Sequence, residues 1–251
     1  MAITGREIHR RYDEFGAIQV FEDNNRRFLT FDGDAEQSCI LLDRPWSPVY
    51  QYCQAMLMAY AFISPAPRRA LVAGLGGGTL VHSLLRIKPT MTVEAVEFRP
   101  EVIAVAREYF LLQQAPPHRI HAGDATEFQG HPGGYELIFS DLFLDNQMNP
   151  AQLTLDYTER CRRALSRHGV LVLNLWLEEK HFYPDAIDLL RRQFDGQLLA
   201  AEVPEGNLVL YLFNGTAPDI SHRMLQREAR ALGKLIEAPL QRVAAAITRL
   251  D

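Results

Sequence analysis

The chain has 251 residues, 47% of them hydrophobic, and a formal net charge of −5. This length supports one sizeable core, and an acidic balance without a dominant basic patch argues against nucleic acid or an anionic membrane as the main partner. No apolar run reaches the roughly 20 residues of a membrane span, and the N-terminus lacks the apolar segment of a signal peptide. The three cysteines are odd in number and far apart, so we expect a reducing, cytoplasmic setting.

Residues 1–62 are expected to form a small antiparallel β-region followed by a linking helix. GAIQVFED (16–23) and RRFLTFDG (26–33) have the composition of strands, and the asparagine pair between them is a favoured turn. QSCILL (37–42) is a third candidate strand. Two prolines then interrupt the chain, and an apolar stretch with helical spacing begins near residue 49.

Residues 63–216 alternate between apolar strand-like runs and runs with helical spacing. Strands are predicted at 70–74, 92–98, 119–124, 135–141 and 169–176, with helices at 79–87, 100–112, 149–165 and 182–194. The last two runs, at 196–203 and 207–215, are separated by PEG and are predicted to form a hairpin. This alternation indicates an α/β fold, a Rossmann-like, seven-stranded sheet of the methyltransferase type with helices on both faces.

Residues 217–251 have helical apolar spacing that Gly233 and Pro239 interrupt. We expect one or two helices in this C-terminal extension. A helix that covers the main domain is the simpler interpretation, and a dimerisation helix is the alternative.

Four glycines fall at the turn between the first parallel strand and its helix, in Gly74-Leu75-Gly76-Gly77-Gly78. Ligands of doubly wound sheets bind beyond the carboxyl ends of the strands. Glycine lets a ligand approach the backbone there, and the helix N-terminus offers free N–H groups to a polar or anionic group. A tight strand-to-helix turn also requires glycine, so the loop alone does not identify a ligand.

Three carboxylates follow successive strands at the same edge of the sheet. Glu97 lies 19 residues after Gly78, where a carboxylate can accept hydrogen bonds from both hydroxyls of a ribose. Asp124 can accept from the exocyclic amine of an adenine, and Asp141 ends the fourth strand. Together these acids predict an adenosine site. NAD is disfavoured because Thr79 occupies the third glycine of its fingerprint, whereas acids suit a sulfonium ligand.

The order and spacing of several blocks resemble the spermidine synthase (polyamine aminopropyltransferase) family, within the class I S-adenosylmethionine-dependent fold. The blocks are FLTFDGDAEQS, AGLGGGTL, AVEFRPEVIAVAREYF, RIHAGDATEF, YELIFSDLFLD and GVLVLNLW, and the resemblance runs from about Tyr12 to Asn214. The family combines a small N-terminal β-sheet, often used in oligomerisation, with a seven-stranded Rossmann-like domain. The resemblance therefore implies a transferase of polyamine biosynthesis that forms a homodimer.

The resemblance also implies two groups of site residues. The first binds S-adenosylmethionine or its decarboxylated form as co-substrate: the glycines hold the methionine-like part, and the others hold ribose, adenine and nucleoside. It comprises Gly74, Gly76, Gly78, Glu97, Asp124, Ala125 and Gln37. The second group lines the site of the small-molecule amine acceptor and deprotonates the attacking nitrogen. It comprises Asp141 and Asp145, which correspond to the aspartates of the family's DxxD loop.

The chain departs from the family pattern at three places, in the contact to the donor's aminopropyl group and in the acceptor site. Its glycine loop carries no aspartate, DLFLD is one residue longer than DxxD, and the family's Tyr-His pair is not matched. Two alternatives therefore stay open: an S-adenosylmethionine-dependent methyltransferase with an unknown acceptor, and a non-catalytic nucleoside-binding protein. No two histidines have metal-ligand spacing, so no metal is predicted. Five aromatic residues and one amide are candidates for the pocket wall: Trp46, Tyr50, Tyr52, Phe143, Trp176 and Asn174.

Overall fold

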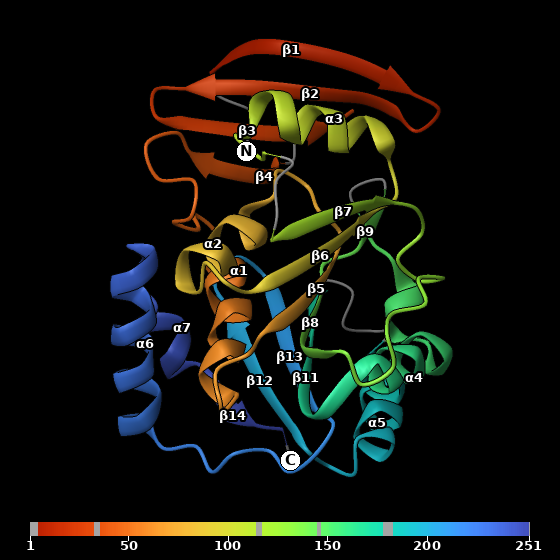
Figure 1. Cartoon of the computed structure of the whole chain (residues 1–251), viewed down its shortest axis with the longest axis vertical. Coiled ribbons are helices and arrows are strands. Elements are labelled where there is room, and N and C mark those ends of the chain that lie inside the picture. Colours follow the sequence, from red (N-terminus) through yellow and green to blue (C-terminus); the bar gives the residue numbers. More distant parts are fainter. Residues whose placement is uncertain (1–4, 33–35, 114–116, 145–146, 178–182, 251) are drawn as a thin grey trace.

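The computed structural model describes residues 5–32, 36–113, 117–144, 147–177 and 183–250. Its N-terminal part is a four-stranded antiparallel sheet in the order β1-β2-β3-β4 (Figure 1). The bounds are β1 Arg6–Asp13, β2 Gly16–Asp23, β3 Arg26–Phe31 and β4 Glu36–Leu41. The last three agree with the predicted strands. β1 was not predicted. REIHRRYD is a charged edge strand without a buried residue, so its sequence lacks the alternation of apolar and polar residues that identifies a strand.

A short helical segment links the two sheets. It consists of α1 Gln51–Leu57 and a 3₁₀ turn, η1 Met58–Phe62. Every side chain from Cys53 to Ala59 is buried. The helix begins two residues later than predicted, and it lies on one face of the main sheet (Figure 1).

The main sheet has eight strands in the order β14-β12-β13-β11-β8-β5-β6-β7. Five of them are parallel: β5 Arg69–Ala73, β6 Thr92–Glu97, β7 His118–Ala122, β8 Tyr135–Ser140 and β11 Leu165–Trp176. The predicted hairpin, β12 Leu198–Val203 and β13 Asn207–Phe213, adds two antiparallel strands next to β11. The predicted α/β methyltransferase-type class is thereby confirmed.

The strand count differs from the predicted seven because the C-terminal extension contributes a strand as well as helices. β14 Ile247–Arg249 pairs with β12 in antiparallel register. Three residues are too few to show a period of two, so no strand was predicted there. The extension's helices are α6 His222–Ile236 and α7 Gln241–Ala245.

Helices cover both faces of the main sheet (Figure 1). α1, α6, α7 and α2 Thr79–Ile87 pack on one face, and α4 Leu155–Ala164 and α5 Tyr183–Gln193 pack on the other. α3 Pro100–Tyr109 lies between the main sheet and the N-terminal sheet, where Val102 and Val105 join the core of the latter. Among the described residues, no helix is both long and apolar enough to cross a membrane.

Two connections differ from the predicted elements. The helix predicted over 149–165 is split into a 3₁₀ turn, η2 Pro150–Leu153, and α4, where the Thr154 hydroxyl accepts from the backbone N–H of Tyr157 as the N-cap. The segment after β8 forms a minimal hairpin of β9 Phe143–Leu144 and β10 Gln147–Met148. This hairpin extends from the edge of the sheet at which the parallel strands end.

Candidate active site

A cavity of about 750 Å³ opens at the carboxyl ends of the parallel strands, between the main sheet and the N-terminal sheet. Seven residues predicted from the sequence line it: Gln37, Gly74, Gly76, Glu97, Asp124, Ala125 and Asp141. Gly78 is not among the lining residues, and Asp145 lies outside the described residues. The cavity is thus large enough for a nucleoside together with a second small molecule.

The glycine loop is folded around the carboxylate of Glu97. Oε2 of Glu97 accepts hydrogen bonds from the N–H groups of Leu75 and Gly76, at 3.0 and 3.4 Å. Gly74 packs so closely against the end of β8 that a Cβ atom would clash with the carbonyl oxygen of Asp141. The loop therefore brings bare backbone to the cavity wall and fixes the position of the carboxylate beside it.

Gly78 has a structural role in the same turn. It adopts a left-handed conformation, with φ of 79°, and is the N-cap of α2. A Cβ atom there would stand 3.1 Å from the side chain of Leu112, on the side away from the cavity. The prediction that all three loop glycines approach the ligand is therefore supported by cavity contact for Gly74 and Gly76 only.

Glu97 also links the cavity to the N-terminal sheet. Its Oε1 accepts from the backbone N–H of Arg99 at 3.0 Å. Burial raises the pKa of Glu97, and the hydrogen bonds from the three N–H groups offset part of that rise. The Arg99 guanidinium pairs with both oxygens of Asp13, at 2.8 and 2.7 Å, and donates to the carbonyl oxygen of Gly16. The β1–β2 turn is thereby fastened beside the cavity.

The side of the cavity that is predicted to bind adenine is built by the loop after β7. Oδ1 of Asp124 accepts from the backbone N–H and the hydroxyl of Thr126, at 2.8 and 2.7 Å, which fixes the carboxylate at the cavity wall. Phe98, which is 41% exposed, faces Phe15 of the β1–β2 turn with ring centroids 4.9 Å apart. An aromatic surface thus lies next to the carboxylates that are predicted to bind the nucleoside.

The other half of the cavity centres on Asp141. Oδ1 of Asp141 accepts from Nδ2 of Asn174 at 2.8 Å, and Oδ1 of Asn174 accepts from Nδ2 of Asn207 at 3.0 Å. Burial raises the pKa of Asp141 to about 6, and hydrogen bonds from Asn174 and Tyr52 counter this only in part. A buried carboxylate whose pKa is raised in this way is a candidate for a proton acceptor.

Aromatic rings enclose this half. Four of the five predicted aromatic residues line the cavity: Tyr50, Tyr52, Phe143 and Trp176. Tyr50 stacks on Tyr52 at 5.8 Å between centroids. Trp46, the fifth, does not line it; its indole N–H donates to Glu237, and the Arg86 guanidinium lies over its ring. Aromatic faces beside carboxylates favour a cationic ligand.

Sequence reasoning did not single out two other acids of the cavity, Glu36 and Glu205. Glu36 pairs with Arg26 at 2.9 Å and accepts from the Tyr50 hydroxyl. Glu205 comes from the β12–β13 turn and accepts from two backbone N–H groups of α1. Glu36 could have been recognised from the sequence, because it directly precedes Gln37, which was predicted to bind the nucleoside. Glu205 becomes a candidate only once the structure shows that β13 pairs with β11.

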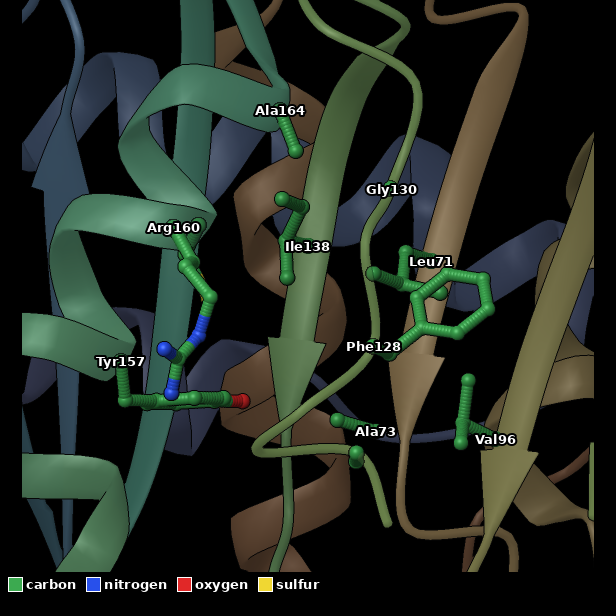
Figure 2. Close-up of a pocket in the computed structure, with 11 residues that line it drawn as sticks. Leu71, Ala73, Val96, Phe128, Gly130, Ile138, Tyr157, Arg160 and Ala164 are labelled. Atoms are coloured by element: carbon green, nitrogen blue, oxygen red, sulfur yellow. The ribbon is translucent and has the colours of Figure 1, made fainter. Parts of the chain in front are cut away.

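A second, much smaller pocket lies behind the part of the cavity wall that contains Ala125, between α4 and the loop after β7 (Figure 2). Val96 and Ala125 line both pockets. The volume of the small pocket is about 10 Å³, which is room for one water molecule. Its charged group, Arg160, reaches Glu127 at 3.7 Å. The pocket is therefore not a substrate site.

In the part of the chain that the structure describes, no group of three or more His, Cys, Asp or Glu side chains is arranged to hold a metal ion.

Comparisons with known proteins agree with this architecture. The chain is 30% identical over 232 residues to the polyamine aminopropyltransferase of Chromobacterium violaceum, a match that covers 90% of this chain and 87% of that one. Its fold is similar to a probable spermidine synthase from Corynebacterium glutamicum, with a TM-score of 0.74 and 20% identity over 93% of this chain and 87% of that chain.

A human methyltransferase-like protein 13, solved with SAH, has a similar fold over 75% of this chain and 93% of its own, at a TM-score of 0.64 and 23% identity. No family model matches the chain. The identity to the Chromobacterium enzyme nevertheless extends over nearly the full length of both proteins. The chain therefore belongs to the polyamine aminopropyltransferase family.

Proposed function

We propose that the protein transfers an aminopropyl group from decarboxylated S-adenosylmethionine to a small-molecule amine. The observation that carries this proposal is the composition of the 750 Å³ cavity. It holds a glycine loop and two nucleoside-type carboxylates on one side, and Asp141 among aromatic rings on the other. A donor with an adenosyl group and an acceptor with an amine can meet in such a cavity.

The donor half has a residue for each part of an adenosyl group. Glu97 is proposed to accept from the ribose hydroxyls, Asp124 from the adenine amine, and Ala125 to contact the base. Gly74 and Gly76 would lie under the aliphatic tail, and Gln37 beside the nucleoside. These residues line a common wall, and the carboxylates of Glu97 and Asp124 are held in place by hydrogen bonds from the backbone.

Charge supports the decarboxylated donor. Among the described residues, four carboxylates of the cavity form no ion pair with a side chain: Glu97, Asp124, Asp141 and Glu205. The cavity arginines, Arg26 and Arg99, are already paired with Glu36 and Asp13. A donor that retains its carboxylate would add an anion to this field, whereas the decarboxylated form carries only cations.

Asp141 is the proposed proton acceptor. An aliphatic ammonium, like that of lysine, has a pKa near 10 and must lose a proton before its nitrogen can attack carbon. The nitrogen lone pair forms the new C–N bond, the C–S electron pair leaves with sulfur as a neutral thioether, and the nitrogen's proton passes to Asp141. The aromatic walls orient the amine and exclude water, which is the main contribution that an enzyme makes to a displacement of this kind.

Turnover tests the proposal. The protein is incubated with decarboxylated S-adenosylmethionine and 1,4-diaminobutane, and the products are identified by mass spectrometry. We expect an amine that has gained an aminopropyl group, together with methylthioadenosine. A parallel incubation contains S-adenosylmethionine as the donor. An amine that gains only a methyl group there would support the methyltransferase alternative. If the protein converts neither donor, the alternative of a nucleoside-binding protein would be supported.

We further propose the organisation that the family resemblance implies. Residues 1–62 would form the N-terminal β-region with its linking helix, 63–216 the adenosyl-binding domain, and 217–251 the C-terminal extension. A homodimer and a cytoplasmic location are part of the same proposal. The small-molecule acceptor makes nucleic acid and membrane partners unnecessary for the reaction.

A further inference from the structure

The turn between β12 and β13 contributes a carboxylate to the acceptor half of the cavity. Glu205, at the tip of this turn, lines the cavity. Its Oε1 accepts from the backbone N–H of Gln51 at 2.8 Å, and its Oε2 accepts from that of Tyr52 at 3.0 Å. Both oxygens are thus held in place by the first N–H groups of α1, and the side chain has a defined position.

The two residues that follow Glu205 contact the same wall. A Cβ atom on Gly206 would stand 3.6 Å from Nε1 of Trp176, so backbone and indole lie close together. Asn207 donates to Asn174, which in turn donates to Asp141. Three successive residues of one turn therefore reach the start of α1, the Trp176 ring and, through Asn174, the proposed proton acceptor.

The charge of Glu205 is available to a ligand. A carboxylate offers about four lone-pair sites, and the two backbone N–H groups occupy only two of them. Glu205 forms no ion pair with a described side chain, whereas Glu36, the other additional acid of the cavity, is paired with Arg26. The acceptor half thus contains two carboxylates without a cationic partner among the described residues, Asp141 and Glu205.

We infer that Glu205 determines acceptor specificity by binding the ammonium group that does not react, while Asp141 faces the nitrogen that does. This inference rests on the proposed aminopropyl transfer. An acceptor with two ammonium groups satisfies both carboxylates, whereas a monoamine satisfies one. A charge-assisted hydrogen bond to an ammonium group is stronger than one to a neutral donor, so the preference for a diamine depends on Glu205.

The test compares two acceptors of equal carbon length, 1,4-diaminobutane and 1-aminobutane, in the parent protein and in Glu205→Gln. The amide keeps the shape of the side chain and one oxygen, but it removes the charge. For the diamine we expect KM to rise on the order of 10-fold, while kcat changes little, because an exposed charge-assisted hydrogen bond is lost. For the monoamine, KM and kcat should stay near the parent values.

Glu202→Gln is the matched control, because Glu202 is an exposed acid of the same hairpin that does not line the cavity. It should leave the ratio of diamine to monoamine kcat/KM unchanged. If Glu205→Gln lowered kcat/KM equally for both acceptors, Glu205 would only support α1, and the inference would be overturned. Lack of any aminopropyl product in the parent protein would instead remove the proposed function itself.

A second measurement covers the case in which Glu205→Gln does not fold. In the parent protein, the KM for the diamine should rise more steeply with ionic strength than the KM for the monoamine, because two charge interactions are screened rather than one. Identical salt dependence for the two acceptors would contradict a second carboxylate contact.

Discussion

Asn174 donates from Nδ2 to Oδ1 of Asp141 at 2.8 Å, and this hydrogen bond joins the end of β11 to the end of β8. The asparagine is itself held by Asn207 of β13. The proposed proton acceptor is therefore positioned by two neighbouring strands. Because the hydrogen bond stabilises the ionised carboxylate, it keeps the pKa of Asp141 from rising further than burial alone would raise it.

The first prediction concerns pH. Since the pKa of Asp141 is raised to about 6, kcat/KM should fall as the pH drops through about 6, where the carboxylate takes up a proton. Asn174→Ala removes a hydrogen bond that lowers this pKa, so the acid limb of the profile should move to higher pH. A limb that stays in place in Asn174→Ala would show that a different group controls it.

The second prediction concerns Asp141→Asn. Activity should fall by at least about 100-fold, the usual contribution of a positioned general base. The free energy of unfolding of this variant should increase above pH 6. The native carboxyl has a pKa of about 6 against a reference of 3.8, so the native state binds the proton more tightly than the unfolded state does, and this group's contribution to stability becomes less favourable as the pH rises from about 4 to 6.

Above pH 6, Asp141→Asn should therefore be more stable than the parent by about 1–3 kcal/mol, measured by denaturant unfolding at pH 8. At pH 4 the two proteins should differ much less. A variant that is less stable at pH 8 and no more stable at pH 4 would contradict the burial of an unpaired charge at this position.

The third prediction separates the two glycines of the loop. Gly76 and Gly78 both have positive φ, 52° and 79°, so alanine at either position should cost about 1–2 kcal/mol of stability. Only Gly76 lines the cavity. Calorimetric titration with methylthioadenosine should therefore show weaker binding in Gly76→Ala, whereas folded Gly78→Ala should bind with the affinity of the parent. Equal affinities in the two variants would remove Gly76 from the site.

The fourth prediction concerns Asp124. Its Oδ1 is held by Thr126, and the carboxylate lines the part of the cavity that is proposed to bind adenine. Asp124→Ala should weaken binding of methylthioadenosine by about 1.5–3 kcal/mol, the cost of losing a hydrogen bond to a charged group. The variant also loses the contact to Thr126, so Thr126→Val is the control for the loop. Parental affinity in Asp124→Ala would refute the assignment of this residue to adenine.

The fifth prediction concerns the junction of the two sheets. The Arg99 and Asp13 side chains are only 7% and 14% exposed, and their ion pair is bidentate. Asp13→Ala leaves the guanidinium without its partner, and breaking such a buried pair costs about 3 kcal/mol. Because the backbone N–H of Arg99 also holds Glu97, the donor KM should rise as well. Loss of stability without any change in donor KM would mean that the junction is structural only.

Three carboxylates of the cavity could be predicted from the sequence because of a general property of parallel sheets. Glu97, Asp124 and Asp141 follow three strands whose carboxyl ends meet at one edge, so their proximity follows from periodicity alone. The same argument identified the glycine turn but did not separate Gly76 from Gly78. That distinction depends on which side of the turn faces Leu112, and side-chain packing of this kind is not encoded in the spacing of glycines.

The acceptor half was harder to predict, because it is assembled from segments that are distant in the chain. Glu205 and Asn207 line the same cavity as Asp141 only because β13 pairs with β11 in antiparallel register, where Asn174 faces Val209 and Trp176 faces Asn207. A one-residue change in that register would turn these side chains to the other face of the sheet. The polar edge strand β1 and the short strand β14 were missed for a different reason, since neither shows apolar alternation.

The most direct measurement is a crystal structure of the protein with methylthioadenosine and 1,4-diaminobutane. We expect the ribose hydroxyls against Glu97, the adenine amine against Asp124, and one amine nitrogen within hydrogen-bond distance of Asp141, all in the cavity that the glycine loop borders. A nucleoside bound elsewhere, or a diamine that does not approach Asp141, would contradict the proposal that one cavity brings donor and acceptor together.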